Sequence, residues 1–468
     1  MIPGIIPAEE AYWTEQWPQV IVGGGGCGMV AALAAAREGG RVLVLEKERE
    51  PGGNTALSTG LIPAAGTRFQ QEAGIQDDSP ELMAEDIFKK NSYQSDPYLT
   101  RLLCEASGEL IEWMVDEIDC ELVCYTDFLY PGQSRFRMHG PPKGYGATLI
   151  HQLRRAVHEN PNIELRPATP AMGLIWDAAQ AVGVRTEAGD IRAASVVLAG
   201  NGFAANTEMV EQYLGSEVAT ALYFGASGNT GEGIVWGMAL GAEPEHMDAY
   251  QGHGSVAVPD GPLVTWGLVT NGAIIVNREG RRFGDESRGY SEFAADVVAQ
   301  PGEEAWEVFD QRVYDASRGT RFEEVIEAGK VAHATSPEDL AKSLSLPAEE
   351  LKATVGSVNS IARGEKNDYL GRTNLTQTLE APFYGIHVRG ALFHTQGGLK
   401  VDSSARVLGE DNLPIPGLYA GGGTAVGVSG RGAEGYLAGN GLLTAVGFGK
   451  IAGGAAAKYA TKTERSRP

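Results

Sequence analysis

The segment of residues 20–28 constrains the possible fold of this chain more than any other part of the sequence. It reads VIVGGGGCG, so an apolar run is followed directly by a G-x-G-x-x-G pattern at Gly23, Gly25 and Gly28. Glycine at these positions permits a tight turn, close approach of the backbone to a pyrophosphate, and close packing of a helix on a strand. The Ala-rich residues 29–38 then predict a helix whose first amide groups favour negative charge. The segment therefore predicts a strand–turn–helix unit that binds phosphates.

A second strand and an acidic residue follow at the distance expected for a dinucleotide site. Residues 41–45 read RVLVL and lead to Glu46. Glu46 follows Gly28 at close to the spacing of about 20 residues that is typical of an acid that binds ribose hydroxyls. Lys47 comes next and joins Glu46 among the candidate binding residues. We infer that the chain binds an adenine dinucleotide. The alternative, a glycine-rich loop in an unrelated sheet protein, accounts less well for two strands, a helix and an acid together.

Composition narrows the class of protein and its partners. The 468 residues predict more than one domain with an ample core. The formal net charge of −22 argues against nucleic acid or an anionic membrane as a partner. No stretch approaches the roughly 20 apolar residues that span a bilayer, and no signal peptide is recognisable, so we expect a cytoplasmic protein without stable membrane insertion. The four cysteines form no disulfide framework, and we predict no metal site.

The order of predicted elements indicates an interrupted nucleotide-binding fold. Parallel-sheet character appears at residues 195–200 and again at 417–423, and both runs end in glycine. The intervening segment from about 248 to 393 is more polar, and we expect helices there at 304–317 and 351–364. Further helices are expected at 97–117, 148–159 and about 439–458. This order predicts an α/β fold that is interrupted by an inserted domain and completed by the C-terminal residues.

Five segments together resemble the fumarate reductase/ketosteroid dehydrogenase flavoprotein superfamily, and the resemblance covers nearly the whole chain. Residues 52–54 are similar to the family's flavin-contacting loop, and 196–203 to its strand and glycine turn before the inserted domain. Residues 277–286 resemble a segment in the middle of that domain. Residues 394–402 and 415–422 resemble the second FAD-contacting region. The resemblance implies a Rossmann-like, glutathione-reductase-like FAD-binding domain that is interrupted by an α+β capping domain.

The resemblance also implies domain limits and a cofactor. The FAD-binding domain is expected at 1–247 and 394–468, and the substrate capping domain at 248–393. From the residues alone, two glycine-rich contacts at opposite ends of the chain already favour a flavin over a nicotinamide dinucleotide. Family members that bind FAD covalently use a histidine in the loop that corresponds to 52–63, and no histidine occurs there, so we expect non-covalent FAD. The candidate cofactor-binding residues are Gly23, Gly25, Gly28, Glu46, Lys47, Gly53, Asn54, Thr55, Gly60, Gly200, Gly422, Gly441 and Leu442.

The substrate-binding pattern departs from that of the fumarate reductases, which hold a dicarboxylate with two histidines, two arginines and a Thr-Glu pair. His253 and His394 match the two histidines, but Trp266 replaces the acid that would follow the threonine. Tyr436 stands at the position of the carboxylate-binding arginine, and Tyr290 at about that of the proton-donor arginine. Loss of both arginines removes the bidentate clamps on which carboxylate recognition depends. The pattern therefore argues against fumarate or succinate as the substrate.

The same departures resemble the ketosteroid dehydrogenases. In that branch a tyrosine at the position of Tyr290 is the base, supported by a tyrosine before a proline, which Tyr130 matches. A further tyrosine, here Tyr436, holds the substrate carbonyl together with a backbone amide four residues later, here that of Asn440. The resemblance implies an FAD-dependent dehydrogenase that introduces an α,β double bond into a cyclic ketone. Tyr290 would remove the α-proton, and flavin N5 would take the β-hydride. The substrate is expected to resemble 4-oxocyclohexanecarboxylate or a ketosteroid.

Two alternatives remain open at this point. The first is a reductase of an α,β-unsaturated acid or enone that uses Arg288, two residues before Tyr290, as the proton donor. In either enzyme His253, His394, Trp266 and Asn440 are the candidate substrate-binding residues. The second alternative is a flavin-binding protein without catalytic activity. The partner is therefore expected to be a small cyclic ketone or enoate, and the electron acceptor is left unassigned.

Overall fold

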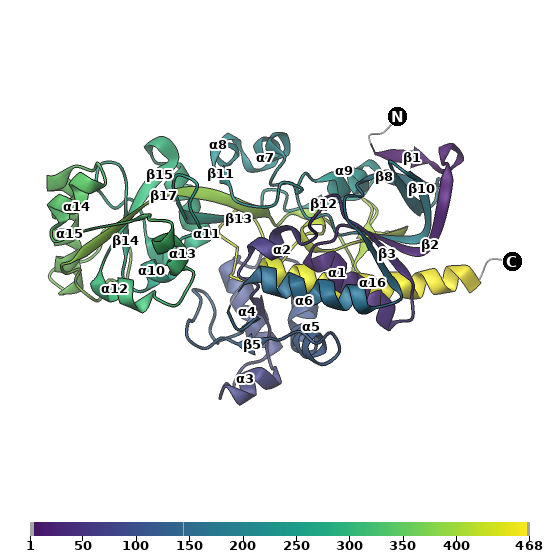
Figure 1. The fold of residues 1–468 in the computed structure, drawn as a ribbon, viewed down its shortest axis with the longest axis horizontal. Helices are drawn as coiled ribbons and strands as arrows, with labels where there is room; N and C mark the ends of the chain where they lie inside the picture. The colour runs from purple at the N-terminus through teal and green to yellow at the C-terminus, as the bar shows by residue number, and fades with distance from the viewer. Residues whose placement is uncertain (1–3, 144, 466–468) are drawn as a thin grey trace. The chain divides into compact units, whose positions relative to one another are not determined.

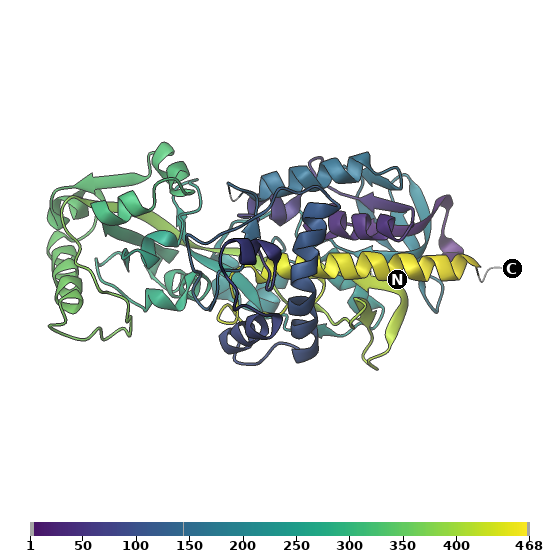
Figure 2. The same ribbon diagram turned by 90° about the horizontal axis from the view of Figure 1, so that it is seen from below.

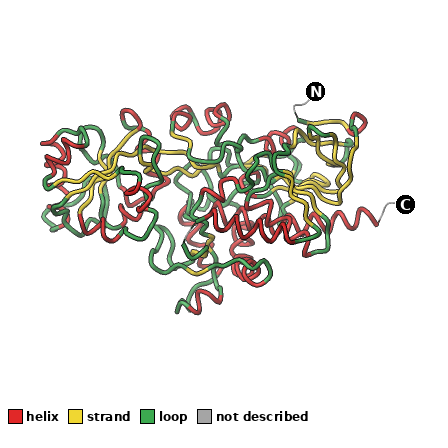
Figure 3. Tube along the Cα trace, in the orientation of Figure 1, coloured by secondary structure: helices red, strands yellow, loops and turns green. Residues whose placement is uncertain are grey.

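The computed structural model describes residues 4–143 and 145–465, which form two compact units. Unit 1 consists of Met1–Leu214, Gly225–Tyr250 and His394–Pro468, and unit 2 of Gly215–Phe224 and Gln251–Phe393. Figure 3 shows a separate group of strands in each unit.

Unit 1 is built on a nine-stranded sheet whose central strands are parallel (Figure 1). Strand β2 (Trp13–Val22) lies between β3 (Val42–Leu45) and β10 (Gly189–Leu198), and β10 also pairs with β20 (Pro414–Ala420). The apolar runs of these strands are buried on both faces, as is usual in a parallel sheet that helices cover. The register aligns Val22 with Leu45 and Leu198, and Leu198 with Ala420. The carboxyl ends of four strands therefore meet at one edge of the sheet.

Two helices rich in small residues pack along each other beside this sheet. They are α1 (Gly26–Arg37) and α16 (Asn440–Arg465), which lie side by side in Figures 1 and 2. A Cβ on Gly453 would lie 2.0 Å from the carbonyl oxygen of Ala31, and a Cβ on Gly449 would lie 2.7 Å from that of Cys27. The helices therefore approach so closely that only glycine fits at these two positions. The helix expected at about 439–458 is confirmed and extends further, to Arg465.

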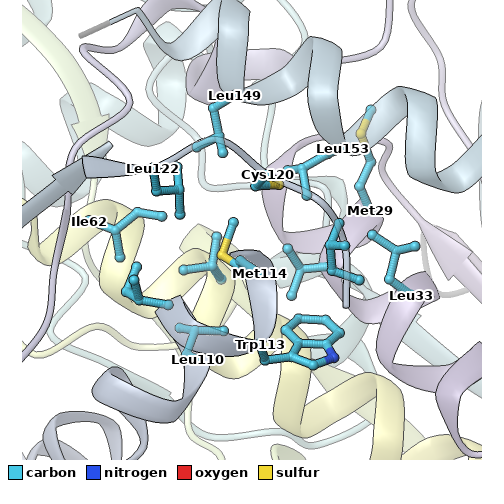
Figure 4. Packing of buried hydrophobic residues seen from close by; sticks show 14 of the residues in the cluster. Met29, Leu33, Ile62, Leu110, Trp113, Met114, Cys120, Leu122, Leu149 and Leu153 are labelled. Carbon is cyan, nitrogen blue, oxygen red and sulfur yellow. The ribbon is translucent and has the colours of Figure 1, made fainter. Parts of the chain in front are cut away.

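A layer of helices covers α1 and forms the core shown in Figure 4. Helix α5 (Pro97–Asp116) begins at an Asp96 cap whose carboxylate accepts from the amides of Tyr98 and Leu99. It contributes Leu110, Trp113 and Met114 to the core, and α6 (Gly146–Glu159) contributes Leu149 and Leu153. Helices were expected at 97–117 and 148–159, and both are confirmed. Cys120 packs in the same core as a free thiol.

Several further strands and helices complete unit 1. They are β1 (Ile5–Pro7), η1 (Ala8–Glu10), α2 (Gly53–Leu57), β4 (Ile62–Pro63), α3 (Arg68–Glu72), α4 (Pro80–Lys90), β5 (Val123–Cys124), β6 (Met138–Gly140), β7 (Ile163–Arg166), β8 (Ala171–Trp176), β9 (Ala181–Thr186), α7 (Thr207–Leu214), α9 (Glu232–Ala239), β12 (Pro244–Glu245), β18 (Gly398–Leu399), β19 (Arg406–Leu408) and η4 (Gly422–Thr424).

Unit 2 has a six-stranded, largely antiparallel sheet with helices packed on it. Its elements are α8 (Ser216–Thr220), β11 (Leu222–Tyr223), β13 (Tyr250–Ala257), α10 (Gly267–Thr270), β14 (Ile274–Val276), η2 (Glu286–Arg288), α11 (Tyr290–Val298), η3 (Pro301–Glu303), β15 (Glu304–Asp310), α12 (Gln311–Ala316), α13 (Phe322–Glu327), β16 (Val331–Ala334), α14 (Pro337–Ser343), α15 (Ala348–Ala362) and β17 (Phe383–Thr395).

One helix prediction in unit 2 is wrong. A single helix was expected at 304–317, but the segment forms β15 and only then the short helix α12. The side chains of Trp306, Val308 and Phe309 are buried, and β15 pairs with β14 on one side and β17 on the other. Aromatic and β-branched residues suit such a central strand, so tertiary pairing overrides the helical pattern. The helix expected at 351–364 is confirmed as α15.

A buried ion cluster joins α4 to the segment that leads into β6, the central strand of a separate three-stranded sheet with β4 and β5. Arg137 is fully buried and binds Asp78 through Nε and Nη2. Its Nη1 donates to Asp86 and, at 2.9 Å, to Oε1 of Gln133. Asp86 also accepts from the amide and hydroxyl of Ser134. The guanidinium thereby fixes the segment that runs from Gln133 to Arg137.

We expect Arg137→Met to lower the free energy of unfolding by about 3–5 kcal/mol, because two buried carboxylates would lose their cation. Urea denaturation of the purified protein measures this change. The matched control is Arg154→Met, which breaks an exposed pair with Glu50 and should change stability by less than about 1 kcal/mol. Equal effects of the two substitutions would contradict the proposed role of the buried cluster.

Candidate active site

The turn after β2 contains two kinds of glycine: Gly23 and Gly28 are required by the backbone conformation or by close packing, and Gly25 leaves open space. Gly23 has φ +113°, and a Cβ on Gly28 would lie 1.8 Å from the Gly23 carbonyl oxygen. Gly23 and Gly28 are therefore required by the turn and by the contact between helix and strand. A Cβ on Gly25, by contrast, would meet only the carbonyl oxygen of Gly52, at 3.6 Å. Gly25 leaves space beside the start of α1.

The N-terminus of α1 suits an anion. No side chain caps it, and its first turn carries no acidic residue. The first amide groups of a helix lack partners within the helix and carry partial positive charge. Gly53, with φ +51°, has no other described atom within 4 Å of its Cβ position, and for Gly200 the nearest is the Val22 oxygen at 4.0 Å. These open positions and the uncapped helix form a cradle that a diphosphate group fits.

Glu46 is held rigidly at the end of β3. It is 8% exposed, and its Oε2 accepts from the amide of Gly24 at 2.7 Å, while Oε1 accepts from that of Glu48 at 2.8 Å. A carboxylate offers about four acceptor directions, so acceptor capacity for hydroxyl groups remains. The ammonium of Lys47 instead donates to Thr230 and pairs with Glu232 within the protein.

The loop after β3 is tied down by its side chains. Asn54 Oδ1 accepts from the amide of Ala226 at 2.7 Å and from Asn229 Nδ2 at 2.9 Å. Thr55 lies directly against Gly26, where a Cβ would come within 2.6 Å of its hydroxyl oxygen. Gly60 has φ +72° and packs on the start of α6. These residues place the loop beside the start of α1.

The C-terminal segment completes the same edge of the sheet. Gly422 has φ +59° and lies against Cys27 of α1, and Leu442 packs on the core of Figure 4. Gly200 follows β10, whose last residue pairs with both β2 and β20. Candidate cofactor residues far apart in sequence are therefore gathered within unit 1.

Three candidate residues with different predicted roles, His394, Tyr436 and Gly441, also lie together in unit 1. A Cβ on Gly441 would lie 2.9 Å from His394 Nε2 and 3.5 Å from the Tyr436 hydroxyl oxygen. The rings of His394 and Tyr436 meet edge to face, with centroids 5.6 Å apart. Burial raises the pKa of Tyr436, and the backbone amides of Gly441 and Gly439 oppose this shift. The backbone amide of Asn440, predicted to hold the substrate carbonyl together with Tyr436, donates to the carbonyl oxygen of Leu437 at 3.0 Å, and the Asn440 side chain donates to Ser429.

Tyr130 belongs to the same group. Burial raises the pKa of Tyr130 to about 12, with a smaller effect from Asp127, and Tyr130 in turn contributes to the raised pKa of Tyr436. Gln133 Nε2 donates to the carbonyl oxygen of Ala438 at 3.3 Å, so the Tyr130 loop is fastened to the segment that carries Tyr436. The buried cluster around Arg137 thus fixes this loop through Gln133.

The other predicted residues form an aromatic group in unit 2. His253 on β13 stacks between Tyr290 and Phe393, with ring centroids 4.9 Å and 5.4 Å away. The ring of Trp266 meets His253 edge to face at 5.8 Å. Burial lowers the pKa of His253 to about 3, and its Nδ1 accepts from the amide of Ser255 at 3.1 Å. His253 is therefore a neutral imidazole whose N–H is at Nε2.

Arg288 has a different environment. Its side chain is 42% exposed and pairs with Asp296 on α11, and Nε contacts the carbonyl oxygen of Asp285 at 3.5 Å. The segment is anchored by buried Glu286, which binds the guanidinium of Arg282. The carboxylate of Asp296 offsets the positive charge of Arg288.

In residues 4–143 and 145–465, no three His, Cys, Asp or Glu side chains gather in a way that could hold a metal ion. Within the same residues, no helix is both long and apolar enough to cross a bilayer.

A parallel sheet with a glycine-lined carboxyl edge, an uncapped helix and a buried acid are typical of a dinucleotide-binding protein, and comparison with known proteins specifies the cofactor. The family model described as FAD binding domain matches residues 19–442. The cytochrome-type fumarate reductase of Shewanella frigidimarina is 34% identical over 454 residues, which cover 95% of this chain and 77% of that protein.

Two solved structures are similar to this chain over nearly its whole length. The open conformation of a flavocytochrome c3 fumarate reductase superposes with a TM-score of 0.83 and 30% identity, covering 97% of this chain and 80% of that one. A 3-ketosteroid Δ4-(5α)-dehydrogenase from Rhodococcus jostii, solved with 4-androstene-3,17-dione, gives a TM-score of 0.77 and 26% identity over 98% of this chain and all of that one. The chain belongs to the FAD-binding flavoprotein family that includes fumarate reductases and 3-ketosteroid dehydrogenases.

The predicted family, fold class and cofactor are confirmed. The protein is an FAD-dependent oxidoreductase that acts on carbon–carbon bonds, with a Rossmann-like FAD-binding domain and a capping domain. The cradle at Gly25, Gly53 and Gly200 and the carboxylate of Glu46 fit this cofactor. Non-covalent attachment stays a prediction. Sequence reasoning missed Gln396 and Ser429, which contact the predicted residues His394 and Asn440, because uncharged buried side chains carry no motif.

We expect Gly25→Ala to weaken FAD binding at least about tenfold, because its Cβ would enter the space beside the phosphate-binding helix. The apoprotein should keep its stability, since that Cβ meets no described protein atom within 3.5 Å. FAD titration and thermal unfolding of the apoprotein check both expectations. Gly454→Ala in α16, with no neighbour within 4 Å of its Cβ, is the matched control and should leave FAD affinity unchanged.

Proposed function

We propose that this enzyme removes hydrogen from two adjacent carbons of a cyclic ketone and thereby forms an α,β-unsaturated ketone. The observation that carries the proposal is the placement of the Tyr436 hydroxyl beside Gly441 and His394, where the fumarate reductases are expected to have an arginine. An uncharged hydroxyl donor suits a carbonyl oxygen, whereas a carboxylate is best held by a guanidinium.

We assign Tyr436 as a hydrogen-bond donor to the substrate carbonyl oxygen. The amides of Gly439 and Gly441 oppose the rise in the pKa of Tyr436 that burial causes, and a phenol oxygen that accepts from amides still carries one hydrogen. Loss of a proton next to a ketone leaves negative charge on the carbonyl oxygen. A fixed hydroxyl donor at that oxygen stabilises the developing enolate. Tyr436 therefore activates the neighbouring C–H bond.

Tyr290 is the residue that we assign as the base. A phenol has a reference pKa of about 10, so Tyr290 acts as a base only as its phenolate, and the phenolate takes a proton only from a carbon that the carbonyl already activates. When bound, FAD supplies the hydride-accepting chemistry. His253 stacks on Tyr290, and Phe393 stacks on His253, so the His253 ring limits the orientations of the Tyr290 ring. Tyr130, close to Tyr436, is assigned a supporting role.

The charge of the candidate residues favours an uncharged substrate. Burial lowers the pKa of His253 to about 3 and that of His394 to about 4, so both imidazoles are neutral at physiological pH. The guanidinium of Arg288 is paired with Asp296. The aromatic faces of Tyr290 and Trp266 suit a flat apolar ring. These observations favour a ketosteroid-like or other neutral cyclic ketone over 4-oxocyclohexanecarboxylate.

Reduction of an unsaturated acid or enone, with Arg288 as the proton donor, is the second candidate. Its support is the 34% identity to a fumarate reductase. The exposed ion pair of Arg288 with Asp296 counts against it, because the guanidinium already donates to a carboxylate within the protein and would have to leave that partner to reach a substrate.

Anaerobic mixing with substrates tests the two candidates directly. The FAD-loaded enzyme is mixed with cyclohexanone, 4-oxocyclohexanecarboxylate and a 3-ketosteroid, and the visible flavin absorbance is followed. Bleaching together with an enone product supports dehydrogenation. Absence of bleaching with all three ketones, together with rapid reoxidation of the reduced enzyme by an unsaturated acid, would refute it.

Three substitutions should separate the roles of the residues. Tyr436→Phe should lower kcat about 10²–10³-fold, as expected for loss of one donor to an oxyanion, and Tyr290→Phe should nearly abolish turnover. Arg288→Met should have a mild effect. Steady-state kinetics at constant FAD content measure all three. Tyr419→Phe, at a buried tyrosine of β20, is the matched control and should retain activity. A large loss with Arg288→Met and a mild one with Tyr290→Phe would support the reductase instead.

A further inference from the structure

A chain of buried hydrogen bonds ends on His394, and all its members belong to unit 1. Asn440 Nδ2 donates to Ser429 Oγ at 3.1 Å, and Ser429 Oγ donates to Gln396 Oε1 at 2.7 Å. Gln396 Nε2 lies 3.1 Å from His394 Nδ1. The exposed fractions are 0% for Asn440, 1% for Ser429 and 4% for Gln396. Water therefore does not compete for these bonds.

The chain has a direction. An amide nitrogen can only donate, so the Ser429 oxygen accepts from Asn440 and its single hydrogen goes to the Gln396 carbonyl oxygen. The amide group of Gln396 then presents an N–H to His394, and Nδ1 must supply a lone pair. The carbonyl oxygen of Thr395, at 3.2 Å, competes for the same nitrogen. An N–H at Nδ1 directed to Thr395 would leave two donors facing each other at Gln396.

The opposite ring nitrogen is the one that lies near the other candidate residues. Burial lowers the pKa of His394 to about 4, so the neutral ring carries one N–H. With Nδ1 accepting, that N–H is at Nε2, beside Gly441 and the Tyr436 hydroxyl. The imidazole Nε2 and the phenol oxygen then both lie within 3.5 Å of the Cβ position of Gly441.

We propose that Gln396, itself oriented by Ser429 and Asn440, fixes the tautomer of His394 with the hydrogen on Nε2, so that His394 is a second donor to the substrate oxygen. Gln396 is a positioning residue that acts through His394. The identity of the oxygen rests on the proposed function, whereas the tautomer does not. Asn440, which the sequence suggested as a substrate contact, begins this series of hydrogen bonds through its side-chain amide.

Nitrogen-15 NMR of histidine in the FAD-loaded enzyme tests the tautomer without any substrate. The chemical shifts of the two ring nitrogens distinguish a neutral ring with hydrogen on Nε2 from one with hydrogen on Nδ1, and His394→Gln identifies the signals. We expect the Nε2–H form in the unmodified enzyme. A ring with hydrogen on Nδ1 overturns the proposal, because the chain of amides would then run in the opposite direction.

Substitutions at Gln396 test the cause. Gln396→Glu places a carboxylate at Nδ1, which should draw the hydrogen to Nδ1 or raise the pKa of His394. Gln396→Met removes the donor and should leave a mixture of tautomers. Gln19→Met is the matched control, because both side-chain polar atoms of buried Gln19 lack a hydrogen-bond partner among the described residues. It should leave the His394 signals unchanged, and flavin absorbance verifies folding of each variant.

The kinetic result separates this proposal from the proposed function. With a ketone that bleaches the enzyme, Gln396→Glu should lower kcat about 100-fold, as for loss of an oxyanion donor. If no ketone is a substrate but the tautomer changes as expected, the proposed function fails and the positioning role stands. An unchanged tautomer in both Gln396 variants overturns the positioning role, whatever the substrate.

Discussion

The contact between Gly28 and the carbonyl oxygen of Gly23 is the constraint on which the FAD-binding edge of the large sheet depends, the edge where the carboxyl ends of β2, β3, β10 and β20 meet. A Cβ at Gly28 would lie 1.8 Å from that oxygen, so α1 can start directly above β2 only with glycine there. The register of the parallel sheet pairs Val22 with Leu45 and with Leu198, and it pairs Leu198 with Ala420. The glycines and the acid that follow these strands are gathered at one edge because parallel strands end together. This is where open α/β sheets bind their ligands.

The proposed substrate residues differ in chemistry from those expected in the fumarate reductases. Tyr290 and Tyr436 stand at positions where the sequence resemblance implies arginines in those enzymes. Burial keeps His253 and His394 neutral, and Arg288 is neutralised by Asp296. The side chains assigned to substrate are therefore hydrogen-bond donors and aromatic faces without net charge. Under the proposed function, such a set discriminates by the position of a carbonyl oxygen and by ring shape, and not by attraction of an anion.

Buried polar clusters hold these side chains in place. Arg137 fixes Gln133, which fastens the Tyr130 loop to Ala438, only two residues after Tyr436. Gln396 and Ser429 act in a similar way on His394. A buried polar group is costly unless every partner is present, so each cluster favours one arrangement of its loop. The precision that catalysis requires is thus supplied by residues that need not touch the substrate.

Local pattern was sufficient to predict the cofactor half of this protein. Strand β2, the turn at Gly23–Gly28, helix α1 and Glu46 follow each other within one short segment, and each has a backbone or spacing requirement that only a few residue types meet. Residues 304–310 escaped prediction because their strand is stabilised by β14 and β17, which lie far away in sequence. The grouping of Tyr130, His394, Tyr436 and Gly441, and the hydrogen bonds that orient them, likewise required the folded chain. Hydrogen-bond direction and burial arise from contacts between distant segments, and no linear motif records them.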